Sequence, residues 1–501
     1  MVVSSRKIKR VLLITPPAFT FADNIDINPV PPLGLAYIAA VLEKNGIEVK
    51  IVDSLIEGWD NRVVIHDNVI RVGLNFDEIK DIITEFSPDI VGVSNLFSKQ
   101  SENAHAIHAK VKEIDKNIIT VAGGAHPTVM PEKVLSDNNV DFVIMGEGEF
   151  VFIDLIREIE GQQRFDTLDG VGYHDAGEIR INPKTSFIEN LDEIPFPARH
   201  LLNMEKYYGL NASHGERRKR KFSPIITSRG CPANCTFCSA HKVWGKRYRY
   251  RSAENVVAEM KELKEKFGIE ELMFEDDNLT LNPKRAEKIF DMMIEQKLDF
   301  VWDTPNGVAA YSLNEALIDK MKLSGCYNIN LAVETGNQYI MDNVIKKPLK
   351  LENVKPIIEY ARKIKIKVGI FLVIGMPGET VEQIWDSFRF ARELKIYYPH
   401  ISVATPYPGS VLYDTCVENK YISETFSTDD LYIRSFSITT ENWDGDKLQQ
   451  LLQEGHEYLL AAYFRDNPIK FMAAHLPKLV VRPLTLMKKT FRMLKAAKGK
   501  G

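Results

Sequence analysis

Short apolar runs alternate with amphipathic stretches along the first 150 residues. Runs rich in β-branched residues predict strands, and periodic apolar positions predict helices between them. The strands are expected at 10–15, 48–53, 90–94, 118–122 and 142–145, and the helices at about 33–45, 77–86, 101–115 and 131–137. Because the strands are apolar throughout, the pattern predicts a doubly wound parallel sheet of the α/β class over residues 1–150.

A second series of strand–helix units spans residues 223–430. The intervening residues 151–222 are expected to form a linker with a β-hairpin at 171–181 and a stiff Pro-x-Pro stretch at 194–198. Residues 431–501 are expected to form a helical C-terminal region. In the second series, strands are predicted at 224–228, 271–275, 300–304, 328–333, 367–373 and 400–405, and helices at 253–266, 283–296, 314–323, 351–363 and 380–393.

Composition limits the class of protein. The chain has 501 residues, 45% hydrophobic and 26% charged, which is typical of a globular protein with two or three domains. Five cysteines, three of them clustered, do not make a disulfide framework. Neither a signal peptide nor an apolar stretch of membrane-spanning length is apparent, so a cytoplasmic location is expected. The net charge of −4 gives no reason to expect a nucleic-acid partner.

Three cysteines, Cys231, Cys235 and Cys238, lie in the run Cys-Pro-Ala-Asn-Cys-Thr-Phe-Cys. Structural zinc sites are usually closed by four protein ligands, and iron–sulfur cubanes normally take four thiolates. Three closely spaced thiolates would leave one iron of a cubane open to a small-molecule ligand. The spacing therefore indicates a reactive metal cluster, with a structural zinc site or three separately packed cysteines as the alternatives.

The CxxxCxxC spacing, with Phe237 before the last cysteine, resembles the signature of the radical S-adenosylmethionine (SAM) enzymes. The resemblance implies that residues 223–430 form a partial (β/α)6 barrel and that the three cysteines hold a catalytic [4Fe–4S] cluster. In that family the open iron binds SAM, and an electron from the cluster cleaves SAM to methionine and a 5′-deoxyadenosyl radical. A flavodoxin- or ferredoxin-like electron donor is implied as a partner.

Motifs at the carboxyl ends of the predicted barrel strands extend this resemblance, because sites in such barrels form there. Strand two is followed by Glu275, Asp276 and Asp277, where the family places polar residues that receive the SAM amino group. Which carboxylate makes the contact is left open, and a helix N-cap is the alternative for any one of them. The other SAM-binding residues implied by the resemblance are Phe237, Glu334 of Ala-Val-Glu-Thr-Gly, and Gly375 and Pro377 of Gly-Met-Pro-Gly-Glu.

The N-terminal sheet has a candidate site of its own, since ligands of parallel sheets lie beyond the carboxyl ends of the strands. No G-x-G-x-x-G follows the first strand, which argues against a dinucleotide. Glycines at two of the strand ends allow the backbone to approach a ligand closely. The candidate residues after the strands are Pro16, Asp53, Asn95, Gly123, Gly124, His126, Gly146 and Glu147.

This segment resembles the cobalamin-binding, Rossmann-like domain that precedes many radical SAM barrels. The resemblance rests on Pro-Pro-Leu-Gly-Leu at 31–35, Gly-Gly-x-His-Pro-Thr at 123–128 and Gly-Glu-Gly-Glu at 146–149, and it implies that the eight candidate residues bind cobalamin. The sequence lacks the Asp-x-His-x-x-Gly run whose histidine ligates cobalt in other cobalamin proteins. A base-off cofactor without that ligand is therefore expected, with His126 as a pocket residue or, alternatively, a loop cap.

A basic segment ends the chain. Residues 475–501 contain eight Lys and Arg residues and no Asp or Glu, and the periodicity from about 484 to 498 predicts an amphipathic helix. Such a helix suits the surface of an anionic membrane. A helix docked on the barrel and a frayed tail are the alternatives. Peripheral contact with the inner membrane face, and with it a lipid-like substrate, are therefore hypotheses.

Together the resemblances imply a cobalamin-dependent radical SAM enzyme that C-methylates an unactivated carbon of a small-molecule or lipid-like substrate. In the resembled class, one SAM methylates cobalamin, and a second yields the radical that removes hydrogen from the substrate. The substrate radical then takes methyl from methylcobalamin. Two alternatives are left open: a cyclisation or rearrangement that uses both cofactors without methyl transfer, and a non-catalytic cobalamin or Fe–S sensor.

Overall fold

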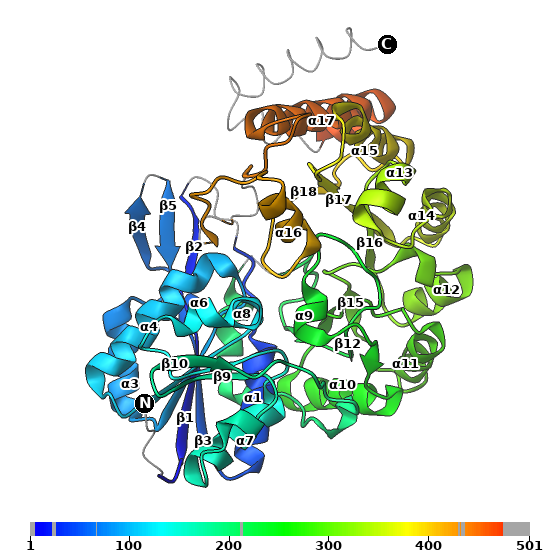
Figure 1. Cartoon of the computed structure of the whole chain (residues 1–501). Coiled ribbons are helices and arrows are strands. Elements are labelled where there is room, and N and C mark those ends of the chain that lie inside the picture. The colour runs from blue at the N-terminus through cyan, green and yellow to red at the C-terminus, as the bar shows by residue number, and fades with distance from the viewer. Residues whose placement is uncertain are drawn as a thin grey trace.

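The computed structural model describes residues 6–22, 27–66, 68–210, 214–428, 431 and 436–473. These residues form two α/β halves that lie side by side (Figure 1). The N-terminal half, blue to cyan, is a sheet with helices on both faces, and the barrel, green to yellow, lies beside it. The predicted basic helix within residues 475–501 lies outside the described residues. Within the described ranges, no helix is long and apolar enough to cross a membrane.

The N-terminal half confirms the predicted doubly wound sheet. Its parallel strands are β1 (Arg10–Thr15), β3 (Glu48–Asp53), β6 (Ile90–Ser94), β7 (Ile119–Gly123) and β8 (Phe142–Ile144), paired in the order β8-β7-β6-β1-β3. The main covering helices are α1 (Leu33–Lys44), α3 (Phe76–Phe86), α4 (Ser101–Ile114) and α7 (Glu149–Glu160). Leu13 of β1 packs on the α1 and α7 side, whereas Leu12 packs on the α3 and α4 side, so both faces of the sheet are buried.

The sheet continues beyond residue 150. Strands β9 (Val171–Asp175) and β10 (Glu178–Ile181) form the predicted hairpin, but they extend the sheet antiparallel to β8 instead of standing in a linker. The rings of Phe142, Phe165 and Tyr173 pack together at this edge and supply the apolar contact that joins the hairpin to the sheet. Residue 150, the expected end of the first domain, therefore lies inside α7.

A small antiparallel sheet beside the main one was not predicted. It consists of β2 (Ala18–Phe21), β4 (Arg62–His66) and β5 (Val69–Val72). Alternation over only four or five residues is too short to distinguish a strand from a loop by pattern. Three short helices complete this half of the chain: α2 (Ser54–Glu57), α5 (Ala125–Val129) and α6 (Pro131–Leu135).

Six parallel strands confirm the predicted partial barrel. β11 (Phe222–Ile225), β14 (Glu271–Phe274) and β15 (Val301–Asp303) form one sheet, and β16 (Asn328–Glu334), β17 (Lys367–Ile374) and β18 (His400–Val403) form another. Bridges between Trp302 and Cys326 and between Val308 and Leu331 join the two sheets. The outer helices are α10 (Ala253–Phe267), α11 (Pro283–Glu295), α12 (Glu315–Leu323), α14 (Val354–Lys363) and α15 (Val381–Glu393).

Shorter elements connect these layers. Two short strands, β12 (Ser228–Arg229) and β13 (Arg249–Tyr250), and the helix α9 (Ala240–Trp244) flank the cysteine run. Helix α8 (Met204–Gly209) belongs to the linker, and α16 (Val411–Glu418) follows β18. The helical C-terminal region is confirmed as far as residue 473: α17 (Gly445–Asp466) packs on α15 beside the barrel (Figure 1).

Candidate active site

The loop that contains the three cysteines is anchored on both sides. At Gly230, φ is +82° and a Cβ would lie 2.3 Å from the Arg247 carbonyl oxygen, so this turn requires glycine. Thr236 donates from its N–H to the Ile345 carbonyl at 3.0 Å and from its hydroxyl to the Val344 carbonyl at 2.8 Å. These bonds tie the cysteine loop to the segment that follows β16.

The three cysteine side chains are half-buried and influence one another. Burial raises the pKa of each thiol, that of Cys235 to about 12, so the ligand-free thiols are protonated and would release protons on binding metal. The Ala240 N–H lies 3.4 Å from Cys238 Sγ and donates to it. In the part of the chain described, no three His, Cys, Asp or Glu side chains are arranged around a single ion. Three cysteine donors fit a [4Fe–4S] cluster with an open iron better than a closed zinc site, which takes four protein ligands.

The three acidic residues after β14 have different partners. Glu275 pairs with His214, with Oε2 2.9 Å from Nδ1, and this pairing raises the pKa of the histidine against its burial. Asp276 is buried and accepts hydrogen bonds from the N–H and the hydroxyl of Thr227, the latter at 2.6 Å. Glu275 therefore holds the segment before β11, and Asp276 holds the segment after β11, next to the end of β14. Of the three, it is Asp277 that acts on the cysteine thiols.

Asp277 lies beside the cluster-binding loop. Its charge raises the pKa of Cys231 and of Cys238, although burial is the larger cause for both thiols. The pKa of Asp277 itself is raised to about 6, first by desolvation among surrounding protein atoms and then by Asp276. Solvent nevertheless reaches the Asp277 side chain, so a ligand can also reach it. The sequence pattern identifies the acidic run but cannot distinguish the roles of its three carboxylates.

Glu334 ends β16 in a strained conformation. Its φ is +70°, in the left-handed region, and the pairing of β16 with β17 shifts register between Ala332 and Glu334. The buried carboxylate accepts a hydrogen bond from Lys347 Nζ at 2.7 Å, in an ion pair that the sequence analysis missed. Both charges act on Cys235. The structure thus brings Glu334 to the cysteine loop, and its contact with SAM stays a prediction.

Glu379, which was not among the predicted site residues, holds the glycine-rich turn after β17 by hydrogen bonds to its backbone. The buried Glu379 carboxylate accepts hydrogen bonds from the N–H groups of Gly375 and Met376, each at 2.8 Å. Burial raises the pKa of Glu379 to about 7. Pro377 lies half-buried on the same turn, and Phe237 is half-buried against the barrel core. In the sequence, the acidic residue two positions after Pro377 was the feature that could have indicated this contact.

On the N-terminal sheet, strand order reverses between β1 and β6. The carboxyl ends of these two strands form the expected ligand crevice. Pro16 is buried there, and Asn95 is buried with its Oδ1 lacking a partner among the residues that the structure describes. Gly123 ends β7. At Gly124, φ is +111° and a Cβ would lie 2.6 Å from the Asn95 carbonyl oxygen, so the neighbouring strand end requires glycine here. The unpaired buried amide oxygen of Asn95 fits a ligand rich in amide groups, as cobalamin is.

Two large apolar side chains that the sequence analysis missed lie at the same crevice. Leu96 and Phe97 directly follow β6 and are 53% and 59% exposed. Single exposed apolar side chains are common, but two neighbouring ones at a ligand crevice form a contiguous patch, and such patches often mark binding surfaces. Their flat apolar surface suits a corrin ring. Two apolar residues immediately after a strand at the switch point were the signal for this surface.

Two of the predicted cobalamin residues have internal partners instead. Asp53 caps α2 and accepts a hydrogen bond from the Tyr207 hydroxyl, while burial raises the pKa of the carboxyl. His126 is buried, with Nδ1 2.9 Å from the Ser98 hydroxyl and Nε2 3.3 Å from the Ser101 hydroxyl. Because both ring nitrogens are engaged, the geometry favours the loop-holding alternative for His126.

Glu147 also has protein partners, and they come from the barrel. Glu147 pairs with Arg229 at 2.9 Å and with Arg249 at 2.8 Å, and Glu149 pairs with Arg229 at 2.5 Å. All four side chains are buried, and together we call them the interdomain clamp. Because Arg229 directly precedes the cysteine loop, the clamp joins the carboxyl edge of the sheet to that loop. Glu147 was expected to bind cobalamin, but its carboxylate is engaged by the arginines of this clamp.

The two candidate sites meet at a seam between the halves. Helix α5, which follows Gly123 and Gly124, packs against α9, which follows Cys238. A Cβ on Gly146 would lie 3.2 Å from the Val243 carbonyl oxygen of α9. The carboxyl edge of the sheet and the cysteine loop therefore adjoin one another.

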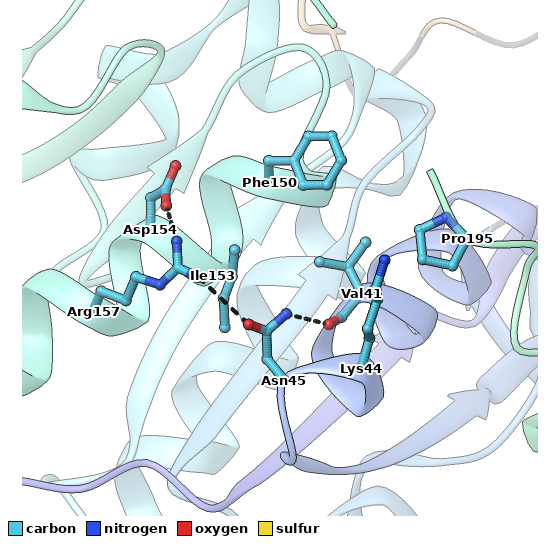
Figure 2. A pocket seen from close by; sticks show the side chains of 8 residues that line it. All are labelled: Val41, Lys44, Asn45, Phe150, Ile153, Asp154, Arg157 and Pro195. Atoms are coloured by element: carbon cyan, nitrogen blue, oxygen red, sulfur yellow. Dashed lines mark hydrogen bonds and ion pairs between the residues drawn. The ribbon is translucent and has the colours of Figure 1, made fainter. Parts of the chain in front are cut away.

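A separate hollow of about 400 Å³ lies between α1 and α7 (Figure 2). Arg157 pairs there with Asp154 at 2.8 Å and donates to Asn45. Asn45 follows the C-terminus of α1, and helices in such sheets run opposite to the strands, so the hollow lies at the edge opposite the ligand crevice. It takes no part in the chemistry considered below. Its lining is Val41, Lys44, Asn45, Phe150, Ile153, Asp154, Arg157 and Pro195.

Comparison with known proteins identifies both halves. The chain matches the B12 binding domain over residues 28–156 and the Radical SAM superfamily over residues 225–391. It is 34% identical to the cytidylyl-2-hydroxyethylphosphonate methyltransferase of Streptomyces wedmorensis over 89% of each chain. It is also 33% identical to an uncharacterized methyltransferase of Pyrococcus horikoshii, over 83% of this chain and 85% of that protein.

A solved structure shares the fold over most of the chain. The radical SAM methyltransferase TsrM from Kitasatospora setae, solved with cobalamin and a [4Fe–4S] cluster, superposes with a TM-score of 0.64. The match covers 82% of this chain and 75% of TsrM at 18% sequence identity, which establishes the common fold. The chain thus belongs to the cobalamin-dependent radical SAM methyltransferase family, as an enzyme whose cofactors are a [4Fe–4S] cluster, SAM and cobalamin.

Proposed function

We propose that this enzyme methylates an unactivated carbon of a small-molecule substrate held at the seam between its two halves. The observation that carries the proposal is the packing of α5 on α9, which brings the cobalamin edge next to the cysteine loop. Methyl transfer to a carbon needs the radical source and the methyl source close to the same substrate atom.

The barrel residues have distinct parts in this scheme. When bound, the cluster with SAM supplies a carbon-centred radical, and cobalamin supplies the methyl group. Asp277 accepts hydrogen bonds from the SAM amino group, because it is the solvent-reached carboxylate beside the thiols. Glu334 binds the ribose or methionine part, and the turn that contains Gly375 and Pro377 positions adenine.

The sheet edge holds cobalamin mainly through backbone and apolar surface. The backbone at Gly123 and Gly124 would lie beside the ring, and the unpaired Asn95 Oδ1 would accept a hydrogen bond from an amide of the cofactor. Leu96 and Phe97 support the flat face of the corrin. His126 would not serve as a cobalt ligand, because both of its ring nitrogens are engaged by hydroxyl groups, which agrees with the expected base-off cofactor that has no histidine ligand.

The inner face of the open barrel edge is the proposed substrate surface. Phe371 and Val373 of β17 are the register partners of His400 and Ser402 of β18, and all four side chains are accessible to solvent. The rings of Phe371 and His400 have centroids 5.2 Å apart. Burial lowers the pKa of His400, so its imidazole is neutral at neutral pH and can donate or accept a hydrogen bond. This surface fits a substrate with an apolar skeleton and at least one polar group.

Isotope transfer tests the proposed reaction. Anaerobically reconstituted protein is incubated with a low-potential reductant, SAM with a deuterated methyl group, and a small-molecule extract of the source organism. We expect one extract component to gain the labelled methyl group with the parent protein and not with the Cys235→Ala variant. A product that changes without gaining carbon would instead support cyclisation or rearrangement.

We also propose peripheral contact with an anionic membrane through residues 475–501, in a protein that acts in the cytoplasm. Support comes from the eight basic residues and the lack of acidic residues in that segment, and from the exposed Phe464, Ile469 and Met472 near the end of the described chain. Such contact would favour a lipid-like substrate. Independently of the membrane, a flavodoxin- or ferredoxin-type protein would supply the electrons. Truncation after residue 474 should abolish co-sedimentation with anionic liposomes, and unchanged partitioning would contradict the proposal.

A further inference from the structure

The buried ion pair between Lys347 and Glu334 has no counterpart in the predicted site, and its surroundings indicate a purpose. Lys347 follows the π-helix η6 (Met341–Ile345) and Lys346, whose φ of +60° ends that helix in a left-handed turn. The Lys347 N–H then donates to the Met341 carbonyl at 3.2 Å. This turn directs the Lys347 side chain into the interior, whereas Lys346 remains exposed. Single-turn π-helices occur often at functional sites.

The ion pair is attached to the cysteine loop through the backbone. Thr236, next to Cys235, donates to the carbonyls of Val344 and Ile345, three and two residues before Lys347. The Lys347 charge acts on Cys235 and Cys231, where it lowers the pKa of the thiol, and Glu334 acts in the opposite direction on Cys235 and Cys238. The two charges of the ion pair therefore lie beside the cysteine loop.

Packing alone gives no reason for this arrangement. Burying a lysine and a carboxylate costs desolvation that their mutual attraction repays only in part, and apolar residues of similar size often give equal or greater stability. Glu334 adds the cost of a left-handed backbone conformation. A charged pair kept under these conditions, beside three thiols, indicates a role at the site itself.

We propose that Lys347 is a positioning residue of the radical-generating site: it fixes the Glu334 carboxylate for SAM and sets a positive charge beside the cluster-binding thiols. The first part rests on the proposed function, in which Glu334 contacts SAM. The second part is independent of the substrate. A nearby cation stabilises the more negative, reduced form of the cluster and so raises its reduction potential.

Two substitutions separate this role from a merely structural one. Lys347→Met removes the positive charge, so the cluster midpoint potential should shift to more negative values. SAM affinity should fall about tenfold or more, as expected when a buried charged partner is lost. Glu334→Gln leaves the lysine charge uncompensated, so the midpoint potential should shift in the opposite direction. Lys347→Arg should recover most of the parent potential, and Lys346→Met is the matched control with unchanged values.

The measurements are the iron content, the EPR-monitored redox titration and equilibrium binding of SAM, all on full-length reconstituted protein. Parent-like potential and affinity in Lys347→Met would overturn the proposal, and so would shifts of the same sign in Lys347→Met and Glu334→Gln. If Lys347→Met does not assemble a cluster, the positive shift in Glu334→Gln against Lys346→Met decides. These properties precede turnover, so a parent that binds SAM but transfers no methyl group would overturn only the proposed methylation.

Discussion

At the barrel mouth the chain offers charged side chains to a ligand, whereas at the carboxyl edge of the N-terminal sheet it offers backbone and apolar surface. The thiols at the mouth have Asp277 and the Glu334–Lys347 pair as neighbours. At the sheet edge, the predicted carboxylates of Asp53 and Glu147 are already bound by protein partners. Both sites lie at the carboxyl ends of parallel strands, but they present different chemistry to a ligand.

The difference follows from what each ligand needs. A cluster with SAM requires specific donor atoms and fixed charges, which only side chains can supply. A large ring with amide substituents is held by shape, by close backbone approach and by apolar contact. Substitutions at the mouth should therefore alter electrostatic quantities, and substitutions at the sheet edge should alter retention of the cofactor.

The largest effect is expected where the two regions are joined. Arg229→Met leaves Glu149 buried without its partner and should lower the free energy of unfolding by about 3–5 kcal/mol. Arg247→Met is the matched control, because the Arg247–Glu189 pair is exposed and should contribute less than about 1 kcal/mol. Denaturant unfolding of the ligand-free proteins measures both. Equal effects of the two substitutions would mean that the clamp does not join the halves.

The next effect concerns the carboxylate assigned to SAM. Asp277→Asn should weaken SAM binding about 10- to 100-fold, the loss expected for one charged hydrogen bond, while Glu275→Gln should leave it nearly unchanged. Because the pKa of Asp277 is about 6, the parent should bind SAM more weakly as the pH falls through 6 and this carboxyl takes up a proton. Asp277→Asn should lack this pH dependence. A stronger loss in Glu275→Gln would transfer the assignment to Glu275.

A smaller effect is expected at the sheet edge. Replacing both Leu96 and Phe97 by serine removes the exposed apolar surface and should lower cobalamin affinity about 5- to 30-fold. Leu323→Ser is the control, since Leu323 is 73% exposed at the end of α12, on the outer layer of the barrel. Retention of cobalamin absorbance after gel filtration measures both variants. Full retention in the double variant would show that the ring is held elsewhere.

The last effect concerns the stability of the turn closed by Glu379 and not the binding of a cofactor. An acid whose pKa is raised to about 7 by folding holds a proton that the unfolded chain releases near 4.5. Its contribution to stability is therefore complete below pH 4.5 and is lost as the pH rises through 7, amounting to at most about 3 kcal/mol. Glu379→Gln keeps an acceptor for the two N–H groups and should flatten this part of the pH profile of thermal unfolding. An unchanged profile would contradict the role of Glu379.

Sequence pattern predicted the parallel strands, the helices that cover them and the cluster of three cysteines, because these depend on periodicity and close spacing. It did not predict the short antiparallel strands β2, β4 and β5. It could not separate Glu275, Asp276 and Asp277, since the partners that engage the first two, such as His214 and Thr227, lie 61 and 49 residues away along the chain. The same limit applies to Glu147, whose partner Arg229 is 82 residues distant. Lys346 and Lys347 are adjacent, a pattern that predicts two solvent-exposed side chains. The turn after η6 buries Lys347 and leaves Lys346 exposed.

The most direct test of the central claim, that one chain brings a SAM-bound cluster and cobalamin to a shared seam, needs no substrate. Reconstituted protein loaded with cobalamin is incubated anaerobically with SAM and reductant, and 5′-deoxyadenosine and S-adenosylhomocysteine are quantified. We predict both products from the parent, only 5′-deoxyadenosine without cobalamin, and no 5′-deoxyadenosine from Cys235→Ala. A cobalamin-loaded parent that forms neither product, or forms 5′-deoxyadenosine equally well after loss of Cys235, would contradict the account.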